Sequence, residues 1–246
     1  MMGKSNKVYE LLQHADACLD LVSVHKMDLL TALGRTILPR GFWGDGHKHN
    51  ISDHPQPSNS RVYLTFDDGP SPHTTPFLLE MLEADGIKAS FFLIGREAEK
   101  YPDLVKAIHE GGHSIGNHTY SHLYMPGLSS RELEAEIERT NSIIEDITGE
   151  KTRIFRPPFG HMDQRTAQVL TEREMHPVYW TQAPEDWAIP GAKRVVRRLQ
   201  MRLKPGSLIV LHEGQNLKEQ TLTAAKEIIY SCKKSELDLA KVQLRA

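Results

Sequence analysis

The sequence has little cysteine, no long apolar run and no excess of charge of one sign. Its 246 residues include two cysteines, Cys18 and Cys232, which lack metal-ligand spacing and are read as reduced thiols in preference to a disulfide. A formal net charge of -2 without a long basic block argues against a nucleic-acid partner.

No stretch of the chain is apolar enough to span a bilayer, so no membrane span is predicted. No N-terminal segment joins a basic start to a continuous apolar run. If Met1 is the native start, the expected location is therefore cytoplasmic. The composition itself, 39% hydrophobic and 25% charged, is that of a globular protein with one large α/β domain or one domain with an appendage.

The first 60 residues differ from the rest and are assigned to an N-terminal helical extension and linker, with the catalytic domain over 61–246. Val8–Leu38 has apolar residues at helical spacing and predicts one or two amphipathic helices. Gly41–Ser60 is rich in Gly, Pro, His, Asn and Asp and predicts a linker or long loop. The linker histidines, His47, His49 and His54, are read as solvated loop residues in preference to a surface metal site.

From Arg61 onward, strand-like and helical segments alternate. Ser129 with Glu132 three residues later predicts a capped helix start. The expected strands are Arg61–Phe66, Ala89–Gly95, His113–Gly116, Thr152–Phe155, Pro177–Thr181 and Ser207–Leu211. The expected helices are Thr75–Ala84, Tyr101–Glu110, Ser129–Ile147, Asp163–Glu172, Lys193–Leu203 and Lys218–Cys232. Repeated β-α units predict parallel strands, as a (β/α) barrel or, alternatively, a doubly wound open sheet.

Polar clusters come at or shortly after the ends of five of these predicted strands. They are Asp67-Asp68, Asn117-His118, Arg156, Asp186-Trp187 and His212. In a parallel α/β barrel the carboxyl ends of the strands converge on one face, where active sites assemble. The positions therefore predict a common site.

Each cluster taken alone has a plainer explanation. Asp67-Asp68-Gly69-Pro70 is a good turn sequence, and His118 with His122 is a spacing that often arises by chance. Arg156 before Pro157 is typical of a structural loop, and His212 of a buried core histidine. Together, however, one carboxylate and two imidazoles make a ligand set for a catalytic divalent metal. The second carboxylate is then available as a base and a histidine as an acid, although the residues alone do not decide which aspartate binds the metal.

The order of these motifs resembles the polysaccharide deacetylases, also called the NodB-homology family of carbohydrate esterases. The resemblance covers roughly Arg61 to Cys232. It rests on Thr65-Phe66-Asp67-Asp68-Gly69-Pro70, Gly116-Asn117-His118-Thr119-Tyr120-Ser121-His122, Arg156-Pro157-Pro158-Phe159-Gly160, Asp186-Trp187 and Leu211-His212.

The resemblance implies a distorted (β/α) barrel and a divalent metal, zinc first, with cobalt or another divalent ion as an alternative. It assigns Asp68, His118 and His122 as metal ligands and Asp67 as the catalytic base.

The remaining motif residues receive supporting roles from the same resemblance. Arg156 would orient Asp67, and Asp186 would hold His212, the catalytic acid. Phe159 would offer a backbone N–H to the oxygen that becomes negative. Trp187 and Leu211 would line the acetyl pocket.

The implied activity is removal of N-acetyl groups from an N-acetylglucosamine-containing polysaccharide: a chitin oligomer, peptidoglycan or an exopolysaccharide. The alternatives are an O-acetyl esterase of the xylan type, an enzyme for small cyclic amides or imides, and a non-catalytic sugar-binding protein. The complete metal set argues against the cyclic amides, and retention of Asp67 and His212 argues against the non-catalytic protein. The expected partner is an acetylated polysaccharide or oligosaccharide, and the oligomeric state is not predicted.

The chain departs from the family pattern in several places. Phe159 stands where tyrosine is usual, Ala183 where another acid is frequent, and Glu213 where aspartate is common. The tail after Cys232 lacks the glycine–aromatic segment that leads into a final strand, which leaves closure of the barrel there open. Relatives are usually secreted or at the cell envelope, in contrast to the cytoplasmic expectation.

Overall fold

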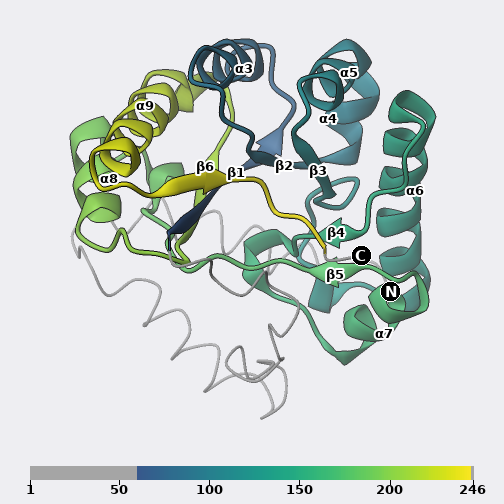
Figure 1. Ribbon diagram of the computed structural model, residues 1–246. Helices are drawn as coiled ribbons and strands as arrows, with labels where there is room; N and C mark the ends of the chain where they lie inside the picture. Colours follow the sequence, from purple (N-terminus) through teal and green to yellow (C-terminus); the bar gives the residue numbers. More distant parts are fainter. Residues whose placement is uncertain (1–59, 245–246) are drawn as a thin grey trace, which may run out of the picture.

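The structure, a computed structural model, describes residues 60–244 (Figure 1). The expected helical extension and linker, with Cys18 and the three linker histidines, lie outside the described residues apart from Ser60. The strands are β1 (Arg61–Gly69), β2 (Ser90–Leu93), β3 (Ser114–Asn117), β4 (Ile154–Phe155), β5 (His176–Pro177), β6 (Leu208–His212) and β7 (Asp238–Ala240). The α-helices are α3 (Thr75–Ala84), α4 (Gly95–Lys100), α5 (Pro102–Glu110), α6 (Ser130–Thr148), α7 (Gln164–Glu172), α8 (Ala192–Gln200) and α9 (Lys218–Lys234).

All seven strands pair in parallel: six follow the order β5-β4-β3-β2-β1-β6, and β7 pairs with β1. The helices form an arc around the outside of this sheet (Figure 1). No continuous ladder joins β5 to β6. One isolated parallel bridge, between Gln182 and Ile209, links the two ends of the order. The sheet is therefore a distorted, incompletely closed barrel, and the predicted fold class is confirmed.

The C-terminal tail forms a strand that the sequence analysis did not expect. β7 pairs with Arg61–Tyr63 at the start of β1. Beyond it, the Val242 N–H donates to Ser90 Oγ at 2.8 Å, and the Val242 carbonyl accepts from Ser114 Oγ at 2.7 Å. The tail thus lies across the amino ends of β2 and β3, at the end of the barrel opposite the polar clusters.

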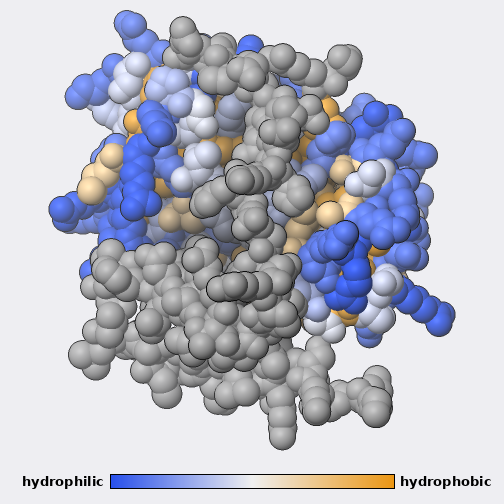
Figure 2. Space-filling model, turned by 90° about the horizontal axis from the view of Figure 1, so that it is seen from below, coloured by the Kyte–Doolittle hydropathy of each residue, from blue (hydrophilic) through white to orange (hydrophobic). Residues whose placement is uncertain are grey.

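The two faces of the sheet carry separate hydrophobic clusters because successive side chains of a strand point to opposite faces. Val62, Leu64 and Phe66 belong to the large cluster that packs against the helices. Tyr63 instead joins Phe92, Ile154, Val178, Leu208 and Val242 inside the barrel. The same alternation carries Thr65 and Asp67 to the inner face, so the hydrophobic pattern of β1 is what aims the first motif into the barrel. On the face seen in Figure 2, the described residues along both sides are largely hydrophilic.

Helix α6 begins as predicted. Ser129 Oγ accepts from the Glu132 N–H, and the Glu132 carboxylate accepts from the Ser129 N–H, so the capping box is confirmed. Helix α3 has its expected bounds, whereas α4 begins at Gly95, which was expected to end a strand. None of the described helices is long and apolar enough to cross a membrane.

Candidate metal centre

The polar clusters meet at the carboxyl ends of the strands, as predicted. Asp67 lies opposite His212 in the β1–β6 register. His118 follows β3, and its N–H donates to the Leu93 carbonyl at the end of β2. Arg156 follows β4, and its N–H donates to the Asn117 carbonyl. Parallel pairing therefore brings segments distant in sequence to one rim.

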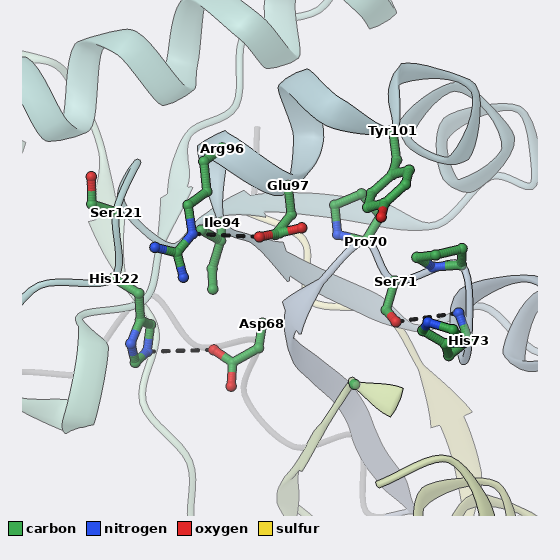
Figure 3. A pocket seen from close by; sticks show the side chains of 12 residues that line it. Asp68, Pro70, Ser71, His73, Ile94, Arg96, Glu97, Tyr101, Ser121 and His122 are labelled. Carbon is green, nitrogen blue, oxygen red and sulfur yellow. Dashed lines mark hydrogen bonds and ion pairs between the residues drawn. The ribbon is translucent and has the colours of Figure 1, made fainter. Parts of the chain in front are cut away.

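Asp68, His118 and His122 form a compact set of potential metal ligands. Asp68 Oδ1 lies 3.5 Å from His118 Nε2 and 3.4 Å from His122 Nε2, and the three ligand atoms lie within 4.8 Å of one another. Figure 3 shows the Asp68 carboxylate facing the His122 ring. Asp68 Oδ1 is buried without a hydrogen-bond partner among residues 60–244, which is costly unless a cation binds it.

Both histidines of this set are suited to ligation in their neutral form. His118 Nδ1 lies 2.7 Å from the Arg156 carbonyl oxygen, which can only accept, so Nδ1 carries the proton and Nε2 keeps its lone pair. Burial lowers the pKa of His118 well below its ordinary value. Burial also lowers the pKa of His122, although the Asp68 charge opposes this effect.

The loop that carries the two histidines is held by side-chain hydrogen bonds and left-handed backbone. Asn117 Oδ1 accepts from the Thr119 N–H at 2.7 Å, and Asn117 Nδ2 donates to the Ile137 carbonyl of α6. Thr119 and His122 have φ of 63° and 55°, and Asp68 has φ of 70°. Left-handed backbone at three non-glycine residues costs conformational energy and is common at functional sites.

Asp67 is the buried carboxylate beside this metal set. Its Oδ1 accepts from Arg156 Nη1 at 2.6 Å, and its Oδ2 lies 3.9 Å from His118 Nε2. Arg156 is itself fully buried and donates also to Thr65 Oγ1 and to the Val178 carbonyl. Burial raises the pKa of Asp67 to about 6, against the lowering effect of the Arg156 and His212 charges.

His212 and Asp186 form an ion pair at the same rim. His212 Nδ1 lies 2.9 Å from Asp186 Oδ1, and the His212 N–H donates to Asp186 Oδ2. Burial alone would lower the pKa of His212, but the Asp186 carboxylate outweighs it and raises the pKa to about 9. The Asp67 and Asp68 charges contribute to this rise, and Asp67 lies directly opposite His212 in the β1–β6 register.

The structure brings two of the three expected substrate-binding residues, Phe159 and Trp187, to the site. The Phe159 ring lies 4.8 Å from that of His122, and the Trp187 ring lies 5.3 Å from that of His212. Leu211 does not face the site, in contrast to the prediction, because it is fully buried in the cluster between sheet and helices. The alternation along β6 places Val210, not Leu211, on the face of His212.

Two further features escaped the sequence analysis. The first is a cavity of about 350 Å³ beside the metal set, whose lining includes Arg96 and Glu97 (Figure 3). Its position was available as a signal, because Arg96 directly follows the predicted strand Ala89–Gly95 and so lies at the carboxyl end of a strand.

The second is Glu213, noted in the sequence only as a departure from a motif. Its N–H donates to the Asp67 carbonyl at 2.9 Å, and its Oε2 accepts from the hydroxyls of Thr74 and Thr75. A Cβ at Gly69 would lie 2.0 Å from its Oε1, so any larger residue there would displace the Glu213 carboxylate. Burial raises the pKa of Glu213 to about 7, against the lowering effect of the two hydroxyls. Glu213 thus ties the end of β6 to the turn that carries Asp68.

Comparison with known proteins gives a consistent picture. The family model for polysaccharide deacetylase matches residues 54–178, just over half of the chain. A peptidoglycan-N-acetylglucosamine deacetylase of Bacillus cereus is 36% identical over 72% of this chain and 84% of the relative. A chitooligosaccharide deacetylase of Azorhizobium caulinodans is 35% identical over 64% of this chain and 75% of the relative. A crystal structure of a peptidoglycan N-acetylglucosamine deacetylase, in complex with a naphthyl-substituted N-oxidanyl-benzamide, superposes with a TM-score of 0.73 at 32% identity. It covers 76% of this chain and 88% of that chain.

Proposed function

The chain belongs to the polysaccharide deacetylase family, and on that premise we propose that it hydrolyses N-acetyl groups of an N-acetylglucosamine-containing glycan with zinc as its metal. Asp68, His118 and His122 would hold the ion. The donor set fits, because two neutral imidazoles and one unpartnered carboxylate oxygen are typical zinc ligands. When bound, the ion supplies Lewis acidity and lowers the pKa of water from about 16 to about 7.

Asp67 accepts the proton of the attacking water. Arg156 Nη1 occupies Oδ1 of this carboxylate and fixes its orientation, while Oδ2 is the oxygen nearer to His118 Nε2. The pKa of Asp67 is raised toward neutral pH, which makes its carboxylate a stronger base than that of an ordinary aspartate. The Phe159 N–H stabilises the negative charge on the acetyl oxygen.

His212 protonates the departing sugar amine, which is a poor leaving group without that proton. Asp186 holds Nδ1 of the imidazolium, so Nε2 is left to donate. The raised pKa keeps His212 protonated at neutral pH. Trp187, packed edge-on against the His212 ring, forms the wall on this side for the acetyl methyl group.

The observation that carries this proposal is the geometry at the rim: Asp67, held by Arg156, and His212, held by Asp186, lie opposite each other in the β1–β6 register beside the metal set. A carboxylate able to take a proton and an imidazolium able to give one are both near Asp68, whose charge contributes to the pKa values of both. A protein that only bound sugars would not need one group placed to accept a proton and another placed to donate one.

The test is acetate release from N-acetylglucosamine oligomers by metal-stripped protein before and after addition of zinc. Zinc should restore release in the wild type, and Asp67→Asn should lower it about 100- to 10,000-fold while zinc still binds. Asp103→Asn, at an exposed position on α5, is the matched control and should behave as the wild type. Zinc-loaded wild type that releases no acetate from these oligomers contradicts the proposal.

An O-acetyl esterase would use the same groups on an easier bond. Parallel rates on N-acetylated and O-acetylated oligosaccharides of equal length separate the two activities. A charged His212 favours the amide, because an amine leaving group needs the proton more than an alcohol does.

A further inference from the structure

The cavity beside the metal set contains an arginine with unused hydrogen-bonding capacity. It lies between the loop after β1 and the segment α4–α5, with Asp68 and His122 at one end. The rest of its lining is mostly polar and includes Ser71, His73, Arg96, Glu97, Tyr101 and Ser121. In Figure 3 the Arg96 and Glu97 side chains point from α4 toward this space.

The position of Arg96 is fixed by the metal-ligand loop itself. Its N–H donates to the carbonyl of Tyr120, a residue between the two histidine ligands, at 3.1 Å. The neighbouring Gly95 N–H donates to the Thr119 carbonyl at 2.9 Å. A Cβ at Gly95 would lie 2.4 Å from Thr140 Oγ1 and 2.9 Å from the Tyr120 ring, so glycine permits this close docking. Arg96 is therefore held next to the centre where the acetyl group reacts.

The guanidinium of Arg96 is only partly compensated. Its Nε lies 3.4 Å from Glu97 Oε1, and the side chain is 53% exposed. Within residues 60–244 its two terminal nitrogens have no hydrogen bond or ion pair. A metal ion held by Asp68, His118 and His122 would repel this charge further, so an anion brought by the ligand would relieve it.

A guanidinium with free terminal N–H groups matches the two oxygens of a carboxylate. We propose that this cavity binds a carboxylate-bearing sugar next to the N-acetylglucosamine being deacetylated, and that Arg96 pairs with its carboxylate. This inference rests on the proposed function and narrows its substrate to acidic glycans. The carboxylate comes from a muramic acid residue whose lactyl group carries no peptide or from a uronic acid, and both are absent from chitin oligomers.

The test compares kcat/KM on three tetrasaccharides of equal length. One alternates N-acetylglucosamine with N-acetylmuramic acid, one alternates it with glucuronic acid, and one contains N-acetylglucosamine alone. The wild type should prefer an acidic substrate about tenfold, and Arg96→Gln should lower that preference five- to tenfold, mainly through KM. Glu97→Gln should raise the preference, since it removes the competing carboxylate. Arg194→Gln, an exposed arginine on α8 outside the cavity, should not change it.

The acidic substrate that loses more in Arg96→Gln identifies the source of the carboxylate. An unchanged preference in Arg96→Gln, or equal losses on acidic and neutral substrates, overturns the assignment. The role of Arg96 can also be tested without turnover, by measuring binding of the same oligosaccharides to zinc-loaded Asp67→Asn. There, Arg96→Gln should raise the Kd of an acidic oligosaccharide about tenfold, and an equal Kd contradicts the inference even if the deacetylase activity stands.

Discussion

Two histidines at the same rim, the buried His118 and the partly buried His212, have opposite pKa shifts. Each uses its Nδ1 in a short hydrogen bond, His118 with the Arg156 carbonyl at 2.7 Å and His212 with the Asp186 carboxylate at 2.9 Å. Burial favours the neutral form of both rings. It prevails at His118, whereas the carboxylate overcomes it at His212.

The difference shows that the partner of Nδ1 divides the labour between the two sides of the site. A carbonyl fixes the tautomer without adding a full charge, so the ring remains a neutral donor of the Nε2 lone pair. A carboxylate makes the imidazolium the stable form, so the ring holds a proton that it can give away. Four predictions test this contrast, in order of decreasing effect.

His118→Ala should have the largest effect, because it removes a metal ligand and leaves Asp68 Oδ1 with one imidazole. Removal of a residue that only hydrogen-bonds to a metal ligand lowers metal affinity roughly 10- to 100-fold. We expect His118→Ala to lower zinc affinity by more than this, with activity lost in parallel. Metal content after dialysis measures this, with His109→Gln on α5 as control. Full zinc content in His118→Ala would falsify the ligand assignment.

His212→Ala should separate the two histidines. We expect turnover to fall about 100- to 10,000-fold, the usual contribution of a positioned acid, because the leaving amine is no longer protonated. Zinc affinity should change little, since His212 is not in the ligand set. Single-turnover rates and zinc titrations on the same preparation give both quantities. Loss of zinc together with turnover would place His212 among the ligands and remove the contrast.

Asp186→Asn converts the partner of His212 from a charged to a neutral acceptor. The pKa of His212 should then fall from about 9, so the alkaline limb of the kcat profile should move to lower pH. At a pH above both the old and the new pKa, each unit of displacement costs about tenfold in turnover. The profile is measured at saturating zinc, with thermal unfolding as a check on folding. An alkaline limb that does not move indicates that another group supplies the proton.

Much of this arrangement was predictable from the sequence because strand order and alternation are local signals. The apolar alternation of β1 and the polar residues at its end indicated both the strand and the place of Asp67. The same alternation of inward and outward side chains, applied to β6, would have excluded Leu211 from the site. The error arose because the motif was compared residue by residue without regard to the two-residue period of a strand.

Other features depend on contacts that no local pattern carries. The residues alone did not distinguish Asp67 from Asp68. The distinction comes from Arg156, which reaches Asp67 across 89 positions of sequence, and from the left-handed backbone at Asp68. Helix α4 was missed because Gly95 follows an apolar run that resembles a strand. The helix begins at Gly95 because of a tertiary contact, in which the metal-ligand loop docks onto the start of the helix.

The smallest predicted effect concerns His113, a third buried imidazole that lies outside the site and has no carboxylate partner in the described part of the chain. Its Nδ1 accepts from the Ala89 N–H at 3.1 Å, and its ring packs edge-on against Phe91. Burial lowers the pKa of His113 to about 4, and the Lys88 and Lys241 charges add to this effect. It is therefore the case in which burial acts unopposed.

The sign of the consequence follows from linkage. Because the folded-state pKa of His113 lies below the unfolded value near 6.5, the unfolded chain binds the proton more readily. The contribution of His113 to stability is complete above pH 6.5 and is lost as the pH falls toward 4, by roughly 1 to 2 kcal/mol at pH 5 after allowance for solvent screening. Urea unfolding of metal-free protein at pH 7 and pH 5 measures it, and His113→Asn should lose less stability between the two pH values than the wild type. An identical loss in both proteins would mean that His113 takes up a proton in the folded state. Burial alone would then not keep an imidazole of this barrel neutral. The neutral form of His118 would in that case depend on the Arg156 carbonyl as well as on burial.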